Sequence, residues 1–185
     1  MVRADAQRNI ETIRRAAIEL FRERGLDVPL TDVAARAGVT KGTIYHRFGG
    51  REGLIDAVID DLVDESMWDI ATRAQSLRDP WERFSAYLTQ IWDLQFTNPA
   101  ANDVLSRTYP DSTRLTQMCE GAIDIGARLV ADAQRAGTLR ADFRPKDLFH
   151  LVWATGTLIR AAPGQSREDF DRHCRLLLDG LRATG

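Results

Sequence analysis

The side chains best suited to chemistry gather between residues 40 and 48. Ile44 and Phe48 lie four residues apart, so on a helix they share one apolar, inward face. The exposed positions would carry hydroxyl, basic and aromatic side chains, namely Thr40, Lys41, Thr43, Tyr45, His46 and Arg47. Such side chains donate hydrogen bonds to phosphates and base edges, so this segment favours contact with DNA.

Two short helices joined by a tight turn would position these side chains. Thr31 can cap the first helix through its hydroxyl, and Gly38 tolerates the left-handed conformation that ends it. Between them lies one apolar helical face, made of Leu30, Val33, Ala34 and Ala37. Thr40 then supplies an N-cap for the second helix, from Lys41 to about Arg47. This layout is a helix-turn-helix, which lays its second helix in the DNA major groove.

Residues 38–54 resemble the N-terminal domain of the TetR family of bacterial transcriptional regulators. In that family the segment typically reads G-V-[ST]-x-G-[ST]-[LI]-Y-x-x-F-x-x-K-[ED]-x-L. The matching residues here are Gly38, Val39, Thr40, Gly42, Thr43, Ile44, Tyr45, Phe48, Arg51, Glu52 and Leu54. Arg51 replaces the usual lysine and keeps a cation for a phosphate, in a planar, forked form. The resemblance is specific over about residues 8–60 and weak beyond.

The resemblance implies two kinds of contact with double-stranded operator DNA. The groove or backbone would be contacted by Lys41, Thr43, Tyr45 and His46, and phosphates would be held by Thr31, Thr40 and Arg51. It also implies a homodimer on a palindromic operator, with repression as the family's commoner mode. Residues 1–50 carry 9 Lys and Arg against 6 Asp and Glu, a net charge of +3, whereas residues 51–185 carry 16 against 21, a net charge of −5. The positive end is the DNA-facing end.

The hydrophobic pattern predicts an all-α protein of about nine helices, because apolar residues recur at helical spacing and no strand pattern competes. Breaks at glycine and proline predict helices near 10–24, 30–37, 41–47, 51–77, 80–97, 99–108, 112–136, 145–161 and 167–182. We expect residues 1–50 to form the helix-turn-helix domain. Residues 51–185 would form a helical domain for effector binding and dimerisation.

The last two predicted helices each carry a broad apolar stripe. The stripe on 167–182 consists of Phe170, Cys174, Leu177, Leu178 and Leu181. The resemblance implies that both helices pack against their twofold mates as a four-helix bundle. The alternative is that the stripes only cover the core of their own domain, and periodicity does not separate the two.

The second predicted domain is rich in aromatic residues, which favours an apolar or aromatic small-molecule effector. The candidate ligand-binding residues are Trp68, Phe84, Tyr87, Leu88, Trp92, Tyr109, Met118, His150 and Trp153. Candidate polar anchors are Gln95, Asn102, His150 and Thr157. The alternative for each aromatic residue is ordinary core packing.

Other classes of protein leave no recognisable signature here. The histidines lack partners at metal-site spacing, and no phosphate loop or nucleophile elbow occurs, so we expect neither a cofactor nor an enzyme. No apolar run of 18 residues and no signal peptide is present, which predicts a soluble cytoplasmic protein without a membrane partner. The sequence thus favours a ligand-responsive repressor. A constitutive dimeric DNA-binding protein and an enzyme on a helical scaffold are the alternatives.

Overall fold

The computed structural model describes residues 2–106 and 113–183, with side chains for 7–63, 66–106 and 120–183. The helices are α1 (Val2–Arg24), α2 (Leu30–Ala37), α3 (Lys41–Phe48), α4 (Arg51–Ile59), the π-helix η1 (Asp60–Asp64), α5 (Glu65–Ser76), α6 (Pro80–Thr97), α7 (Pro99–Ser106), α8 (Thr113–Arg135), α9 (Pro145–Ala161) and α10 (Arg167–Leu181). Because α4, η1 and α5 follow one another without a break, the described residues form nine helical rods. This confirms the predicted all-α fold.

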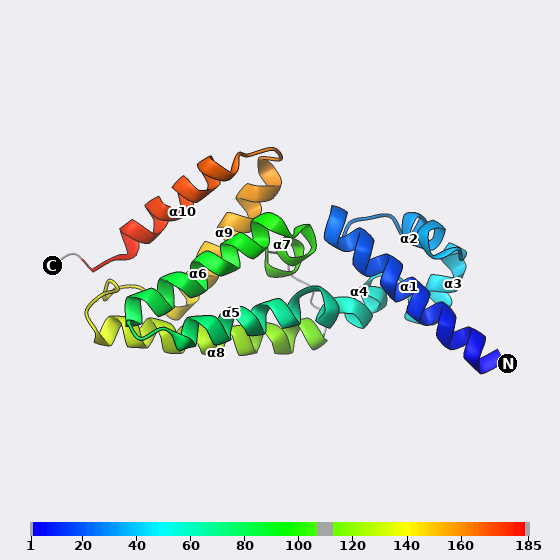
Figure 1. The fold of residues 1–185 in the computed structure, drawn as a ribbon, viewed down its shortest axis with the longest axis horizontal. Coiled ribbons are helices and arrows are strands. Elements are labelled where there is room, and N and C mark those ends of the chain that lie inside the picture. Colours follow the sequence, from blue (N-terminus) through cyan, green and yellow to red (C-terminus); the bar gives the residue numbers. More distant parts are fainter. Residues whose placement is uncertain (1, 107–112, 184–185) are drawn as a thin grey trace.

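Figure 1 shows two lobes. The N-terminal lobe comprises α1–α3 and lies at one end of the molecule. The C-terminal lobe comprises α5–α10, and α4 with η1 joins the two. In the C-terminal lobe α6 is the central helix, because α5, α7, α8 and α9 all pack against it.

Local signals set most helix ends, with one correction. Thr40 caps α3 as predicted, and Gly38 ends α2 in the left-handed conformation with φ of 67°. Thr31 does not cap α2. The N-cap of α2 is Pro29, whose carbonyl accepts from the Asp32 N–H at 2.9 Å, so the helix begins before Thr31 and leaves its hydroxyl inside the first turn.

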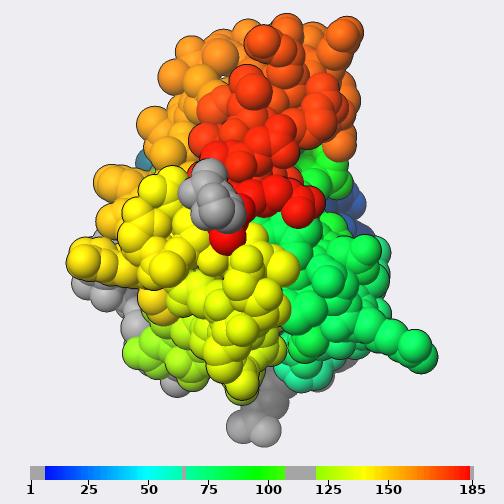
Figure 2. Space-filling model, turned by 90° about the vertical axis from the view of Figure 1, so that its left-hand side faces the viewer, coloured from blue at the N-terminus to red at the C-terminus, as the bar shows by residue number. Residues whose placement is uncertain are grey.

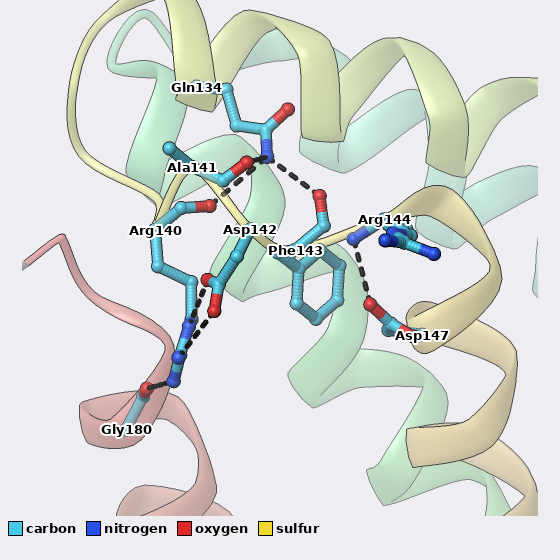
Figure 3. Close-up of polar contacts among 8 residues, drawn as sticks. All are labelled: Gln134, Arg140, Ala141, Asp142, Phe143, Arg144, Asp147 and Gly180. Carbon is cyan, nitrogen blue, oxygen red and sulfur yellow. Dashed lines mark hydrogen bonds and ion pairs between the residues drawn. The ribbon is translucent and has the colours of Figure 1, made fainter.

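Helix α10 is held at its two ends. At the first end, Arg167 pairs with Asp93 at 2.6 Å and Phe170 stacks on Phe96 at 4.4 Å between centroids. At the second end, Arg140 donates to the Gly180 carbonyl at 3.2 Å (Figure 3). In Figure 2 this last part of α10, in red, meets both the yellow segment after α8 and the green start of α6.

The loop between α8 and α9 is ordered by its own hydrogen bonds, which makes it a firm anchor for α10. Gln134 donates through Nε2 to three carbonyls, those of Arg140, Ala141 and Phe143, at 3.1, 3.3 and 2.7 Å (Figure 3). Between the anchored ends of α10, a groove of about 530 Å³ separates it from α6.

Candidate DNA interface and effector region

Helix α3 presents a polar outer face on a buried apolar anchor. Ile44 is fully buried, whereas Lys41, Tyr45 and His46 are exposed. The Lys41 ammonium lies 5.5 Å from the centre of the Tyr45 ring, within the range of a cation–π contact. Tyr45 is 51% exposed, so its ring and hydroxyl are accessible on the outer face of α3.

The first turn of α3 is fixed by hydroxyl groups. The Thr43 N–H donates to the Thr40 hydroxyl oxygen at 3.2 Å, and the two hydroxyls lie 3.0 Å apart. Both residues were predicted to contact DNA, and the structure places them side by side at the positive end of the helix dipole, which favours an anion. Thr31, predicted to hold a phosphate, is exposed on α2.

Helix α2 is braced against α1 by ion pairs on the surface. Arg36 pairs with Glu19 at 3.1 Å, and Arg24 pairs with Asp32 at 2.9 Å. Surface pairs of this kind contribute little to stability, about 0–1 kcal/mol each. The orientation of α2, on which α3 packs, is therefore set mainly by its buried apolar residues, such as Leu30 and Val33.

Arg51 differs from the other predicted DNA contacts because it is half-buried. Its Nη1 donates to the carbonyl of Leu26, in the loop between α1 and α2. The sequence indicated only a phosphate contact, which stays a prediction, and missed this internal bond. No local signal could have found it, since 25 residues separate the partners.

Three of the predicted ligand-binding residues lie at the surface. Trp68 is 71% exposed and Trp153 is 57% exposed, while the His150 side chain is 68% exposed and lies 3.8 Å from Asp147. The Trp153 indole N–H donates to the Ser106 carbonyl at 2.5 Å. Helical spacing placed these residues in the right helices, but it did not separate their inner faces from their outer ones.

Four other predicted ligand-binding residues lie together on the buried face of α6: Phe84, Tyr87, Leu88 and Trp92. Phe84 meets Phe143 edge-on at 5.7 Å, and the Tyr87 hydroxyl donates to the Ala122 carbonyl at 3.4 Å. Burial raises the pKa of Tyr87 to about 12. Tyr109 and the side chain of Met118 lie outside the described residues. None of the seven candidates whose side chains the structure describes lines the groove between α6 and α10.

A polar core, which we define as Gln95, Asn102, Asp103, Ser106 and Thr155, is buried among α6, α7 and α9. Gln95 donates through Nε2 to Asn102 Oδ1 at 3.2 Å and to the Val152 carbonyl at 3.1 Å. Asn102 in turn donates to the Gly156 carbonyl at 3.1 Å. The sequence identified Gln95 and Asn102 as possible anchors but missed the other three members.

Three buried side-chain atoms in and beside the polar core lack hydrogen-bond partners. Gln95 Oε1, Thr155 Oγ1 and the Trp92 indole N–H are buried and unpaired. Buried polar atoms without partners are costly, so each needs an explanation. Together they offer an acceptor, a hydroxyl and a donor on the facing helices α6 and α9.

Two other kinds of site are absent from the part of the chain that the structure describes. No group of three His, Cys, Asp or Glu side chains could hold a metal ion there. None of the described helices is both long and apolar enough to cross a membrane.

Two segments of the chain match known domain families. Residues 13–58 match bacterial regulatory proteins of the tetR family, and residues 79–183 match the C-terminal domain of SbtR-like transcriptional regulators. The chain belongs to the TetR family of bacterial transcriptional regulators. Membership confirms the helix-turn-helix fold and places the chain among DNA-binding regulators, which are not enzymes.

Individual TetR-family proteins are similar over much of the chain. The HTH-type transcriptional regulatory protein RaaS of Mycobacterium tuberculosis is 30% identical over 145 residues, which cover 78% of this chain and 66% of RaaS. The chain spans smaller shares of the other curated relatives that it matches.

Solved structures give the same architecture. A TetR/AcrR-family regulator from Thermobifida fusca is 29% identical, with a TM-score of 0.67 over 92% of this chain and 97% of that one. The ketosteroid regulator KstR2 of Mycobacterium tuberculosis, at 18% identity, has a TM-score of 0.68 over 95% of each chain. The likeness to KstR2 concerns the fold alone.

Proposed function

We propose that this protein is a homodimeric, ligand-responsive repressor that leaves a palindromic operator when a small molecule binds its C-terminal lobe. The observation that carries the proposal is α3, with Ile44 buried beneath it and Lys41, Tyr45 and His46 exposed along it. Residues 1–50 would form the DNA-binding domain and residues 51–185 the effector-binding and dimerisation domain. Its place of action would be the cytoplasm, where bacterial DNA is found.

The proposed interface with DNA combines two roles. Lys41, Thr43, Tyr45 and His46 would face the groove or backbone, and Thr31 and Thr40 would hold phosphates. Arg51 has an internal partner, so its phosphate role requires a test of its own.

The two lysines of the chain allow a matched test of DNA binding. Duplexes would be selected from random DNA with the full-length protein, and the affinity of Lys41→Ala would be compared with that of Lys146→Ala. Both variants lose the same charge, but Lys146 is exposed on α9, in the other lobe. We expect Lys41→Ala alone to weaken binding, by roughly 1 to 3 kcal/mol if it reads a base. Failure to enrich any duplex, or equal losses for both lysine variants, would reject the proposed interface.

Dimerisation through α9 and α10 is proposed from apolar side chains that the single chain leaves uncovered. Leu176 on α10 is 58% exposed and Trp153 on α9 is 57% exposed, with Phe149 at 36%. In contrast, the predicted stripe of α10 packs largely on its own lobe, because Phe170 and Cys174 are buried. The neighbouring face, which includes Leu176, is therefore the one available to a second copy.

The effector is proposed to be a small apolar or aromatic molecule that also carries a hydrogen-bonding group. Its apolar part would pack against the aromatic side chains on the buried face of α6. Its polar group would engage Gln95 Oε1 and the Thr155 hydroxyl, which lack partners. Binding to one conformer shifts the dimer towards it only as far as the difference in affinity allows.

Tryptophan fluorescence can test this site, because all four tryptophans lie outside residues 1–50. A panel of small aromatic acids, amides and alcohols would be screened for quenching and for loss of operator affinity. A ligand that does both supports the proposal. Ligands that quench without changing operator affinity, or a panel without a binder, favour the constitutive DNA-binding alternative. The close packing of the aromatic rings on α6 also agrees with that alternative.

A further inference from the structure

The peptide groups at Leu26 are held from both sides by the side chains of Asp103 and Arg51. The Leu26 N–H donates to Asp103 Oδ2 on α7 at 2.8 Å, and the Leu26 carbonyl accepts from Arg51 at the start of α4. Leu26 is 1% exposed and Asp103 is 6% exposed, so the bond between these two residues is shielded from water. One residue of the loop between α1 and α2 is therefore tied to two distant elements.

The fit between this loop and α7 requires glycine at position 25. Gly25 has φ of 81°, in the left-handed region, and a Cβ atom there would lie 2.6 Å from Asp103 Oδ2. A larger side chain would push the carboxylate away from the Leu26 N–H. The approach of α7 to the N-terminal lobe thus depends on both the carboxyl group of Asp103 and the absence of a side chain at Gly25.

Within the polar core, the residue before Asp103 joins α7 to the two neighbouring helices. Asn102 accepts from Gln95 on α6 and donates to the Gly156 carbonyl on α9. Consecutive residues of an α-helix point about 100° apart, so Asn102 and Asp103 serve adjacent faces of the same short helix. A shift of α7 relative to α6 and α9 therefore changes the position of the carboxylate that holds Leu26.

We infer that Asp103 and Arg51 are positioning residues for DNA binding. By holding Leu26 between them, they fix the orientation of the N-terminal lobe on α7 and couple the polar core to α3. Neither residue needs to touch the effector, and the positioning role of Arg51 replaces a contact with phosphate. This inference rests on the proposed function, because it concerns how the DNA-binding lobe is oriented.

A contact between α1 and the segment that joins the lobes supplies a matched control. Arg14 of α1 pairs with Asp61 of η1 at 2.9 Å, and both side chains are substantially exposed. Asp61→Leu therefore removes a carboxylate that also faces α1, but it leaves the Leu26 bonds intact. If the inference holds, DNA binding slows hydrogen exchange in α7 of Asp61→Leu as it does in the wild type. In Asp103→Leu this change in α7 is lost.

Hydrogen exchange of the full-length protein, with and without a duplex selected by the wild type, can test the coupling without an effector, because coupling between sites is reciprocal. In the wild type and in Asp61→Leu, we expect DNA to slow exchange in α3 and also in α7. In Asp103→Leu, DNA should still slow exchange in α3, but the change in α7 should be lost. Asp103→Asn, which keeps an acceptor oxygen, should restore part of it.

Arg51→Met provides a second variant, should Asp103→Leu fail to fold. The α7 response is the slowing of hydrogen exchange in α7 when DNA binds. Its loss in Arg51→Met, with an unchanged salt dependence of DNA affinity, supports the positioning role. A salt slope lowered by about one phosphate contact, with the α7 response intact, overturns it. An α7 response in Asp103→Leu equal to that of the wild type also overturns the inference while leaving DNA binding in place. If the wild type selects no duplex, the proposed function fails and the inference fails with it.

Discussion

The two lobes bury different kinds of side chain. Among the described residues up to 50, every buried side chain is apolar, from Ile13 to Ile44, and the other buried positions are Gly25 and Gly50. In the C-terminal lobe, five polar side chains are buried beside the aromatic rings: Gln95, Asn102, Asp103, Ser106 and Thr155. An apolar interior needs only shape, whereas a buried polar group needs a partner in the right direction.

This difference suits a division of labour between the lobes. A lobe that presents α3 to DNA gains from an interior with one packed arrangement, since a shift of the presented side chains would cost affinity. A lobe that responds to a small molecule needs interior groups whose bonds can be exchanged with those of a ligand. The unpaired atoms of Gln95 and Thr155 are such groups.

The largest expected effect comes from the close approach of Gly53, in the first turn of α4, to the end of α3, the helix that the N-terminal lobe presents to DNA. A Cβ atom on Gly53 would lie 1.7 Å from the Phe48 carbonyl oxygen, a backbone atom that cannot move aside alone. We expect Gly53→Ala to lower the free energy of unfolding by about 3 kcal/mol or more and to abolish DNA binding. Urea unfolding followed by circular dichroism, together with operator affinity, provides the measurement.

The control for this change lies in the other lobe. Outside its own stretch of helix backbone, no atom of the described residues lies within 4 Å of a Cβ built on Gly121 in α8, so Gly121→Ala should leave stability unchanged or raise it by about 0.4 to 1 kcal/mol. Similar stabilities for Gly53→Ala and Gly121→Ala would show that the turn between α3 and α4 adjusts. The rigidity assigned to the N-terminal lobe would then be wrong.

The same contrast explains which features the sequence could predict. Helical periodicity and the prolines at positions 80, 99 and 145 marked the helices correctly, because these signals act within one turn. The helix-turn-helix was recognisable for the same reason: the bond between Thr40 and Thr43 spans only three residues.

Features that depend on distant partners could not be predicted in this way. The bond from Leu26 to Asp103 spans 77 residues, and the bond from Gln95 to the Val152 carbonyl spans 57. Trp68 was expected in a pocket because it is aromatic, yet it lies on the outer face of α5. Residue type and spacing predict that a helix exists, but the rotation of that helix in the lobe depends on all of its neighbours.

The second prediction concerns assembly through the C-terminal lobe. Leu177 and Leu181 are half-buried against their own core, so charge there would also disturb folding. Leu176→Glu tests the dimer more directly, because Leu176 is exposed in the single chain. A carboxylate buried in each half of a twofold interface should raise the dissociation constant at least about a hundredfold, or roughly 2.7 kcal/mol.

Sedimentation velocity distinguishes the outcomes of this test. Gln75→Glu, which adds the same charge at an exposed position on α5, is the control and should remain as associated as the wild type. A dimer that persists in Leu176→Glu would exclude this face of α10 from the interface. The same result would leave the exposed Trp153 and Leu176 without a proposed partner.

Two reciprocal isosteric changes test the comparison of the interiors. Val33 is fully buried in the apolar N-terminal lobe, so Val33→Thr adds a hydroxyl without a partner and should cost about 1 to 3 kcal/mol. Thr155→Val removes an unpaired hydroxyl from the polar core and should raise stability by about 1 kcal/mol. Urea unfolding measures both. A loss of stability in Thr155→Val would mean that its hydroxyl has a partner in solution, and would remove one of the proposed effector contacts.

The smallest predicted effect concerns the ionisation of a buried phenol. Burial raises the pKa of Tyr87 from its ordinary 10.0 to about 12, so the folded state keeps the phenol neutral where the unfolded state already ionises it. The resulting stability is present in full below about pH 10 and is lost as the pH rises towards about 12. Between pH 9 and pH 11 the wild type should therefore lose roughly 1 kcal/mol more than Tyr87→Phe, since one pKa unit corresponds to about 1.4 kcal/mol. Urea unfolding at the two pH values measures the difference, with the same substitution at the exposed Tyr45 of the N-terminal lobe as the control. Equal losses in the wild type and in Tyr87→Phe would mean that water reaches the phenol. The buried face of α6 would then be more open than the contacts of Phe84 with Phe143 and of Tyr87 with Ala122 indicate.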